Sequence, residues 1–487
     1  MARSTAKHSI YISRNSVPWL FAGVAASVLL LLCCLGVLTL SNTTYLSIAM
    51  GTVGVCMVYC IRELPSRFLL FGFNATYFLF LLSGLAMKLF DQEAIVSYLA
   101  SGEEAASHAC LCIALSILVI DLTAFVLFEH HRDQLRSNWS APMENCPNVT
   151  RQIILVLLLL SMACKLGTSL LRYVNTLVSG YSSIYQAKVE LPELLRIPAS
   201  VFYMLLSLWL VTRPGKWQFL ACFSIILLIE GLVFFSGDRG ESTSALLFLL
   251  FYIYRRGKED RSFFRITKLH VAAALLLLPL LIYLMQYVSF TRRHNTVVIE
   301  SLFADFFESQ GISAQIMSKG YLLKDEIAAI GGHSYATGSL RSYVLHNALT
   351  RALFGTDRVI ANTEAIALSG ESYGSTMAYL RFRVSYLGGV GCGTSFIAEL
   401  WHDGGFPLLI IGSGLVACLI DLVSRKTAEN SSLFISAVFT MMILYIIRLP
   451  RDNCFAWLTE TLSVNNLVLL VLLLLVSSAA RRRKGPS

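Results

Sequence analysis

Long apolar segments recur along almost the whole chain, and they constrain its fold more than any other feature of the sequence. A helix that crosses a membrane needs about 20 mainly apolar residues. Twelve segments approach or exceed that length: 17–40, 43–61, 67–89, 105–128, 151–171, 194–212, 217–235, 242–254, 269–288, 405–423, 431–447 and 462–480. The sequence therefore predicts an all-α polytopic membrane protein with about 12 transmembrane helices. The segment 242–254 is short for a span unless its helix continues into Arg255.

The balance of charges supports this class of protein and gives it an orientation. Only 14% of the residues are charged and 56% are hydrophobic, whereas soluble domains contain about 25% charged residues. With a cytoplasmic N-terminus, 22 of the 39 Lys and Arg residues fall in inner segments, as the positive-inside rule expects. The net charge of +9 therefore reflects membrane topology rather than nucleic-acid binding. The first apolar segment lacks a clear cleavage site, so we interpret it as a membrane anchor.

One predicted loop is much longer than the others. The topology divides the chain into helices 1–9 (residues 1–290), a large outer loop (291–404), and helices 10–12 with a basic cytoplasmic tail (405–487). Connections of this length are usually functional. Within the loop, 301–319 and 340–354 have apolar residues at mixed spacings of three and four. We expect both segments to form amphipathic helices that lie on the membrane.

Six arginines are predicted at the outer ends of spans, where the positive-inside rule disfavours them. They are Arg172, Arg239, Arg292, Arg293, Arg448 and Arg451. A guanidinium group stays charged and binds phosphate through two parallel hydrogen bonds. Such a group at the outer surface suits a lipid-linked phosphate or pyrophosphate. The alternative for each arginine is a side chain that reaches a lipid headgroup, and for Arg448 and Arg451 an ion pair with Asp452 or Glu460.

Arg239 stands out among these arginines because it lies in Ser236–Ser242, SGDRGES, between two apolar segments. Charged residues at such a position are costly, so they usually mark a functional site. If a helix begins near Glu241, Ser236 or Asp238 is placed to cap it, and its free N–H groups favour an anion. The acidic neighbours of Arg239 would weaken its positive charge.

Several residues are candidates for the general base of a reaction at this face. The histidines His294, His333, His346 and His402 all lie in the large loop, and histidine titrates near neutrality. Glu399 lies in the apolar stretch SFIAEL before a span. A carboxylate in such surroundings is suited either to accept a proton or to orient an arginine.

The sequence gives no sign of a metal site or a cofactor. Zinc and calcium signatures are absent, and the large loop has no DxD-type acidic pair. We therefore expect a metal-independent reaction that uses no cofactor. Most cysteines lie within apolar segments, where they are small buried hydrophobes. Cys392 and Cys454 would face the oxidising side, and the sequence leaves open whether a disulfide joins them.

Four stretches in this order resemble the bacterial O-antigen polysaccharide polymerase family, the Wzy-like polymerases. They are SGDRGES at 236–242, FFESQG at 306–311, GTSFIAELWHDGGF at 393–406 and RLPRD at 448–452. The resemblance covers roughly residues 170–460, while the first 150 residues match only as generic spans.

This resemblance implies a GT-C-like membrane glycosyltransferase in the bacterial inner membrane, with its active site facing the periplasm. Such enzymes join oligosaccharide repeat units carried on undecaprenyl pyrophosphate, and family members work with a flippase and a chain-length regulator. By position, Arg239, Arg292 or Arg293, and Arg448 would hold pyrophosphate, and Arg239 would also help it to leave. Glu399 or a loop histidine such as His333 would activate the acceptor hydroxyl.

Two other functions are compatible with parts of this pattern. An O-antigen ligase would have a similar fold and donor but would use lipid A-core as its acceptor. A transporter or flippase of lipid-linked oligosaccharides would also have about twelve spans. The transporter interpretation predicts repeated halves, broken mid-membrane helices and short loops, none of which is visible in the sequence.

Overall fold

The computed structural model describes most of the 487-residue chain. The described ranges are 17–99, 101–136, 148–179, 193–236, 239–260, 302–330, 333–356, 361–428 and 432–482, with residues 262–264, 267, 270, 272, 276–277 and 279–284 between them. Within these ranges every regular element is a helix, and no strand occurs. The predicted all-α fold is therefore confirmed for the described residues.

The long helices follow the predicted apolar segments closely. They are α1 (Val17–Cys34), α2 (Asn42–Arg62), α3 (Leu64–Tyr77), the π-helix η1 (Phe78–Leu82), α4 (Ser83–Ala86), α6 (Glu103–His130), α8 (Asn148–Ser179), α10 (Glu193–Ser200), α11 (Phe202–Val211), α12 (Lys216–Ser236), α13 (Arg239–Glu259), α22 (Phe396–Ala428), α23 (Leu433–Arg448) and α25 (Val464–Arg482). Helices α3, η1 and α4 form one continuous path, and α10 and α11 form another. Eight helical paths in the described residues are long and apolar enough to cross a membrane.

The structure describes the four other predicted spans to different extents. The helices α1 and α25 contain shorter apolar stretches, Ala22–Cys34 and Val464–Ala479. Helix α13 continues past Arg255 to Glu259, so the segment that was short in sequence becomes a 21-residue helix. Only parts of 269–288 are described. The chain is thus a multi-pass membrane protein, and the count of twelve spans stays a prediction.

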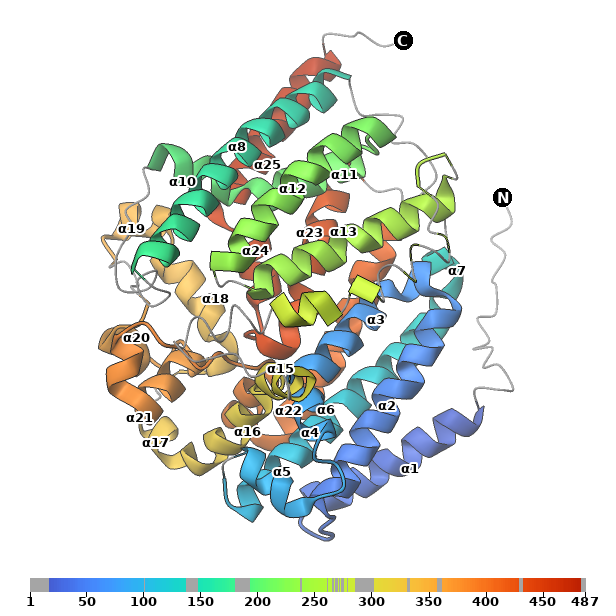
Figure 1. Ribbon diagram of the computed structural model, residues 1–487, viewed down its shortest axis with the longest axis vertical. Coiled ribbons are helices and arrows are strands. Elements are labelled where there is room, and N and C mark those ends of the chain that lie inside the picture. Colours follow the sequence, from blue (N-terminus) through green and yellow to red (C-terminus); the bar gives the residue numbers. More distant parts are fainter. Residues whose placement is uncertain are drawn as a thin grey trace, which may run out of the picture.

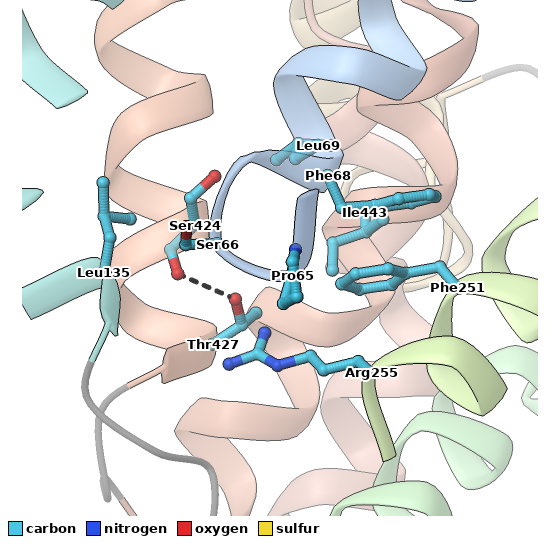
Figure 2. Close-up of a pocket in the computed structure, with 10 residues that line it drawn as sticks. All are labelled: Pro65, Ser66, Phe68, Leu69, Leu135, Phe251, Arg255, Ser424, Thr427 and Ile443. Atoms are coloured by element: carbon cyan, nitrogen blue, oxygen red, sulfur yellow. Dashed lines mark hydrogen bonds between the residues drawn. The ribbon is translucent and has the colours of Figure 1, made fainter. Parts of the chain in front are cut away.

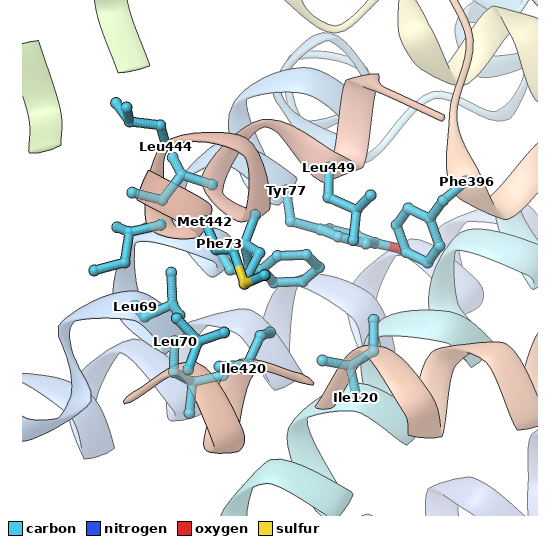
Figure 3. Close-up of a cluster of buried hydrophobic side chains, with 14 of the residues drawn as sticks. Leu69, Leu70, Phe73, Tyr77, Ile120, Phe396, Ile420, Met442, Leu444 and Leu449 are labelled. Carbon is cyan, nitrogen blue, oxygen red and sulfur yellow. The ribbon is translucent and has the colours of Figure 1, made fainter. Parts of the chain in front are cut away.

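Helix α6 is the centre of the N-terminal group of helices. Its neighbours α1, α2 and α22 pack along it, and Figure 1 shows these helices running side by side in the lower right of the molecule. The core between α3, α6, α22 and α23 is built from buried Phe73, Tyr77, Ile120, Phe396 and Ile420, which face one another in Figure 3. Because lipid is as apolar as these side chains, close packing and hydrogen bonds hold the helices together.

A layer of shorter helices covers one end of the helix bundle. We call this end the outer face and the opposite end the inner face, after the topology predicted from the sequence. The layer consists of α5 (Gln92–Leu99), α15 (Leu302–Gln310), α16 (Ser313–Leu322), α17 (Lys324–Ile330), α18 (Tyr335–His346), α19 (Ala348–Phe354), α20 (Glu364–Leu368), α21 (Tyr373–Leu387), the 3₁₀ helix η2 (Leu449–Arg451) and α24 (Ala456–Thr461). The short α7 (Arg132–Arg136) lies at the inner face. Most of this outer layer comes from the predicted large loop.

The two segments expected to lie on the membrane are helical but are placed differently. Segment 301–319 forms α15 and most of α16, and Ala314, Ile316 and Met317 of α16 are buried. Helix α16 packs against α5, α6 and α22, so it belongs to the protein core rather than to a membrane surface. In contrast, α19 exposes Leu349 and Leu353, as an amphipathic surface helix would.

The two candidate disulfide cysteines carry free thiols. Both Cys392 and Cys454 are partly buried, and the Cys392 thiol lies 3.4 Å from the Gly374 carbonyl oxygen. Burial raises the pKa of Cys392 to about 11, so its thiol stays protonated at neutral pH.

A buried ion-pair network closes the inner face. The guanidinium of Arg67, only 4% exposed, lies 3.0 Å from Glu129 and 3.3 Å from Glu63, and it donates to the Tyr59 carbonyl oxygen. It also covers the Tyr59 ring at 3.6 Å. Arg132, which is 39% exposed, extends the network with a 2.6 Å contact to Glu63. The network joins the inner ends of α2, α3 and α6.

Replacing Arg67 with Leu should destabilise the protein by about 3–5 kcal/mol, because buried Glu129 would lose its 3.0 Å cation and keep only the 3.7 Å contact to Arg132. The midpoint of thermal unfolding in detergent measures this effect. Arg132→Ala is the matched control, since its exposed ion pair should contribute at most about 1 kcal/mol. Equal destabilisation by both variants would contradict the interpretation.

Candidate functional site

The outer halves of four helices bring together a group of charged side chains. Lys165 of α8 forms a 2.9 Å ion pair with Glu241, in the first turn of α13. The Lys165 ammonium also lies 5.4 Å from the ring centre of Tyr203 on α11. The Tyr203 hydroxyl donates a 2.9 Å hydrogen bond to Glu230 Oε1 of α12. Glu230 is fully buried, and its Oε2 has no hydrogen-bond partner within the described residues.

Arg448 at the end of α23 extends this group. Its guanidinium lies 2.7 Å from Asp452 Oδ2 and 5.6 Å from the ring centre of Tyr445. Arg448 interacts electrostatically with Glu241, and Glu460 of α24 is close enough to interact with Arg448 and Asp452. We call Lys165, Glu241, Arg448, Asp452 and Glu460 the outer charge group. The sequence predicted the Arg448–Asp452 pair as one alternative for that arginine, and the structure confirms that contact.

Arg239 is placed at the edge of the outer charge group by its position in the chain. It is the first residue of α13, two positions before Glu241. Its side chain lies outside the described residues, as do Gly237 and Asp238. Ser236 does not cap α13, because it is the last residue of α12 and its hydroxyl donates to the Val233 carbonyl oxygen.

Two of the other four predicted arginines are described, and both are exposed. Arg172 is exposed on α8, seven residues beyond Lys165, and Arg451 is exposed with its guanidinium 5.4 Å from the ring centre of Phe80. Arg292 and Arg293 lie outside the described residues.

Glu399 is buried and holds two segments together. It lies in the first turn of α22, whose backbone is non-helical at Gly404 and Gly405, so the span predicted from residue 405 matches the part of α22 after this kink. Its side chain is 2% exposed. Glu399 Oε1 accepts a 2.8 Å hydrogen bond from the Thr394 hydroxyl, and Oε2 accepts a 2.9 Å bond from the Cys454 backbone N–H. The carboxylate thereby fixes the turn that follows Asp452 against the start of α22.

His333 lies at an open cavity of about 320 Å³ beside this region. The cavity is lined by Ala328, His333, Ser334, Tyr335, His402 and Asp403. Asp403 caps α18, because it accepts hydrogen bonds from the Ser334 hydroxyl and from the N–H groups of Tyr335 and Ala336 at 2.6, 3.0 and 2.7 Å. His333 itself is exposed, so it is accessible from the cavity.

Aromatic rings connect the cavity with the surroundings of Glu399. The rings of Tyr335 and Tyr373 lie 5.4 Å apart, and His402 lies 5.2 and 5.8 Å from them. Tyr373 interacts electrostatically with both Glu399 and Asp403, and burial raises its pKa well above the usual value for tyrosine. Its phenol is therefore neutral at ordinary pH.

His346, another predicted candidate, lies in a separate cluster. His346 Nε2 is 3.7 Å from Glu371 Oε2, and Arg341 Nε is 3.3 Å from Glu371 Oε1. Glu371 is 6% exposed at its side chain, which makes it the buried centre of this cluster. His294 lies outside the described residues.

A second cavity lies at the inner face and is too small for a substrate. It encloses about 10 Å³ between Pro65, Leu135, Phe251, Arg255 and Thr427, as Figure 2 shows. A space of this size holds at most about one water molecule. No group of three His, Cys, Asp or Glu side chains that could hold a metal ion occurs within the described residues.

The sequence analysis did not single out Lys165, Tyr203 or Glu230. Lys165 and Glu230 are charged residues inside the apolar segments 151–171 and 217–235. Ionisable residues within spans are rare and usually face the interior of the helix bundle. This signal was available in the sequence, but only the packing of α8, α11, α12 and α13 shows that the three side chains meet.

Comparison with known proteins identifies the family. The family model described as O-antigen polysaccharide polymerase Wzy matches residues 21–484, which is nearly the whole chain. No curated protein and no solved structure matches the chain. The GT-C-like arrangement therefore stays a prediction. Both the family match and the multi-pass helical fold agree with the resemblance noted in the sequence, and the chain belongs to the O-antigen polysaccharide polymerase Wzy family.

Proposed function

We propose that this protein joins undecaprenyl-pyrophosphate-linked oligosaccharide repeat units on the periplasmic face of the bacterial inner membrane. The growing glycan leaves its lipid carrier and is transferred to the non-reducing end of a new lipid-linked unit. Membership of the polymerase family supports the reaction class. The helical spans support a membrane location, and the charge distribution supports a periplasmic site. A flippase and a chain-length regulator are the proposed partners.

In this proposal, the outer charge group binds the pyrophosphate of the donor lipid. Lys165 and Arg448 come from helices far apart in sequence, and both interact with Glu241 at the start of α13. Arg239, the first residue of that helix, adds a third cation to the proposed site. An arriving pyrophosphate would replace Glu241 and Asp452 as the partner of these cations, because phosphate forms stronger charge-assisted hydrogen bonds.

The other arginines have a more peripheral place in the proposal. Arg172 and Arg451 are exposed, so we assign them to the outer phosphate or to lipid headgroups. Arg292 and Arg293 follow the predicted ninth span and are proposed to contact the donor there. None of these assignments requires a metal ion or a cofactor.

The proposed reaction is a displacement at the anomeric carbon of the donor. The acceptor hydroxyl oxygen forms a bond to this carbon, and the bond from the carbon to the phosphate oxygen breaks. The leaving undecaprenyl pyrophosphate takes the electron pair, and the cations of the site neutralise its developing charge. The proton of the acceptor hydroxyl moves to a general base.

His333 and Glu399 are the two proposed bases, and their surroundings favour different roles. His333 is exposed at a cavity, so an acceptor sugar can reach it. Glu399 is buried and both of its oxygens already accept hydrogen bonds. We therefore assign proton acceptance to His333, and to Glu399 the positioning of the turn that carries Asp452.

Arg448→Ala should reduce polymerisation by about 10²–10³-fold, since one charge that stabilises the leaving group is lost. Single-repeat glycans should replace long chains, as measured with purified lipid-linked repeat units in vesicles. Arg448→Lys should retain part of the activity, because lysine keeps the charge but not the paired hydrogen bonds. Arg383→Ala is the control, since Arg383 is 59% exposed and its ion-pair partner Glu364 is also exposed. Long chains from Arg448→Ala would refute the assignment, and transfer to lipid A-core would indicate a ligase.

Two substitutions, each of which removes one charge, test the proposed role of Lys165. Lys165→Met should abolish long chains, whereas Glu241→Gln should retain more activity because the cation remains. If the ion pair is only structural, the double variant should recover, since it leaves no unpaired buried charge. We expect the double variant to stay inactive while folding normally. Recovery of long chains in the double variant would exclude Lys165 from the pyrophosphate site.

His333→Ala should slow glycan transfer by about 10²–10⁴-fold, which is the usual contribution of a general base. Binding of the donor lipid should not change, because His333 lies apart from the outer charge group in this proposal. Single-turnover transfer and donor binding, measured separately, distinguish the two effects. Unchanged transfer would move the assignment of the base to Glu399.

A further inference from the structure

A carboxyl group lies deep in the helix bundle, away from the proposed site. Asp121 belongs to α6 and is 6% exposed, and its partner Asn74 on α3 is completely buried. No ion pair to Asp121 occurs among the described residues. An ionised carboxylate in apolar surroundings without a cation is very costly, and such groups usually neutralise instead.

The hydrogen bonds around Asp121 show which atom lacks a partner. Asn74 Nδ2 donates a 2.9 Å hydrogen bond to Asp121 Oδ1 and a 3.1 Å bond to the Leu70 carbonyl oxygen. The Cys56 thiol of α2 is a further hydrogen-bond neighbour of Asp121, and its sulfur lies 3.4 Å from Asn74 Nδ2. Asn74 Oδ1 remains without any donor in the described part of the chain, and an ionised Asp121 cannot supply one, so this oxygen would stay buried and unsatisfied.

A proton on Asp121 supplies the hydrogen-bond donor that Asn74 Oδ1 lacks. We infer that Asp121 is held in its protonated form and that its O–H donates to Asn74 Oδ1. The carboxylic acid and the carboxamide then form a closed ring with two hydrogen bonds, one in each direction. The titratable neighbours Cys56 of α2 and Tyr77 of α3 are neutral groups and supply no compensating charge. The ligand of this site is therefore a proton.

The Asp121–Asn74 pair also supports the position of Arg448 at the outer face. Two residues beyond Asn74, the Thr76 hydroxyl donates a 2.5 Å hydrogen bond to the carbonyl oxygen of Ile447. Ile447 directly precedes Arg448 in α23. By fixing the rotation of α3 against α6, the protonated pair holds the helix that supports Arg448. Asp121 is thus a positioning residue, and this consequence rests on the role proposed for Arg448.

Asp121→Asn is the variant that tests the proton most directly. Two carboxamides at 74 and 121 can form the same closed ring, so this variant should fold, keep its unfolding midpoint and make long chains. Asp121→Ala removes the donor to Asn74 Oδ1 and one acceptor of Asn74 Nδ2, so it should lower the unfolding midpoint. If Asp121→Asn folds but makes only single repeats, the charge of Asp121 is needed and the inference is wrong.

Infrared difference spectroscopy supplies a readout that does not depend on polymerisation. The difference between the unmodified protein and Asp121→Asn should contain the C=O stretch of a protonated carboxyl group and no carboxylate bands. Carboxylate bands would overturn the inference. So would an unfolding midpoint that rises with Na⁺ but not with choline, since a cation would then bind the two oxygens. These results stand even if the proposed glycan transfer proves wrong.

Discussion

The cost of placing charge and polar atoms in an apolar bundle governs this structure. At the inner face, Arg67 is buried only because Glu63, Glu129 and a backbone carbonyl surround its guanidinium. At the outer face, Lys165 and Arg448 are each paired with a carboxylate. A cation that is already paired can bind an anionic substrate only by exchanging partners. In the proposed function, pyrophosphate therefore binds by replacing Glu241 and Asp452 as the partners of these cations.

Helix α3 connects these regions. Its inner end carries Arg67, its middle carries Asn74, and its Thr76 bonds to the residue before Arg448. The path then continues through η1 to α4, where the Ser83 hydroxyl donates to the Phe307 carbonyl oxygen at the outer layer. The α3–η1–α4 path, which is kinked at Arg67, thus contacts the ion pairs at the inner face, the buried polar pair and the support of the outer site. Packed interiors transmit such constraints because their side chains have few alternative positions.

Much of the fold could be predicted because apolar length is a local property. Eleven of the twelve predicted segments coincide with described helices, and 269–288 is described only in part. The Arg448–Asp452 pair was also predictable, since side chains four positions apart in the sequence are neighbours along a helix. In contrast, the buried placement of α16 was not, because its apolar spacing suits a membrane surface as well as a protein core. The helical turns of α22 before its kink at Gly404 and Gly405 were not predicted, since polar residues such as Glu399 and Asp403 interrupt the apolar run there.

The sequence by itself determined the class of protein, the helical segments and the arginines near span ends, because each depends on residues close together in the chain. The tertiary structure decided which charges meet. Lys165, Tyr203, Glu230 and Glu241 come from four different helices, and no spacing within one segment brings them together. It also decided that Glu399 is a buried hydrogen-bonded carboxyl group, because the Cys454 N–H that bonds to it lies 55 residues away. Contacts between distant segments arise only when helices pack, and the energy of a buried charge depends on those contacts.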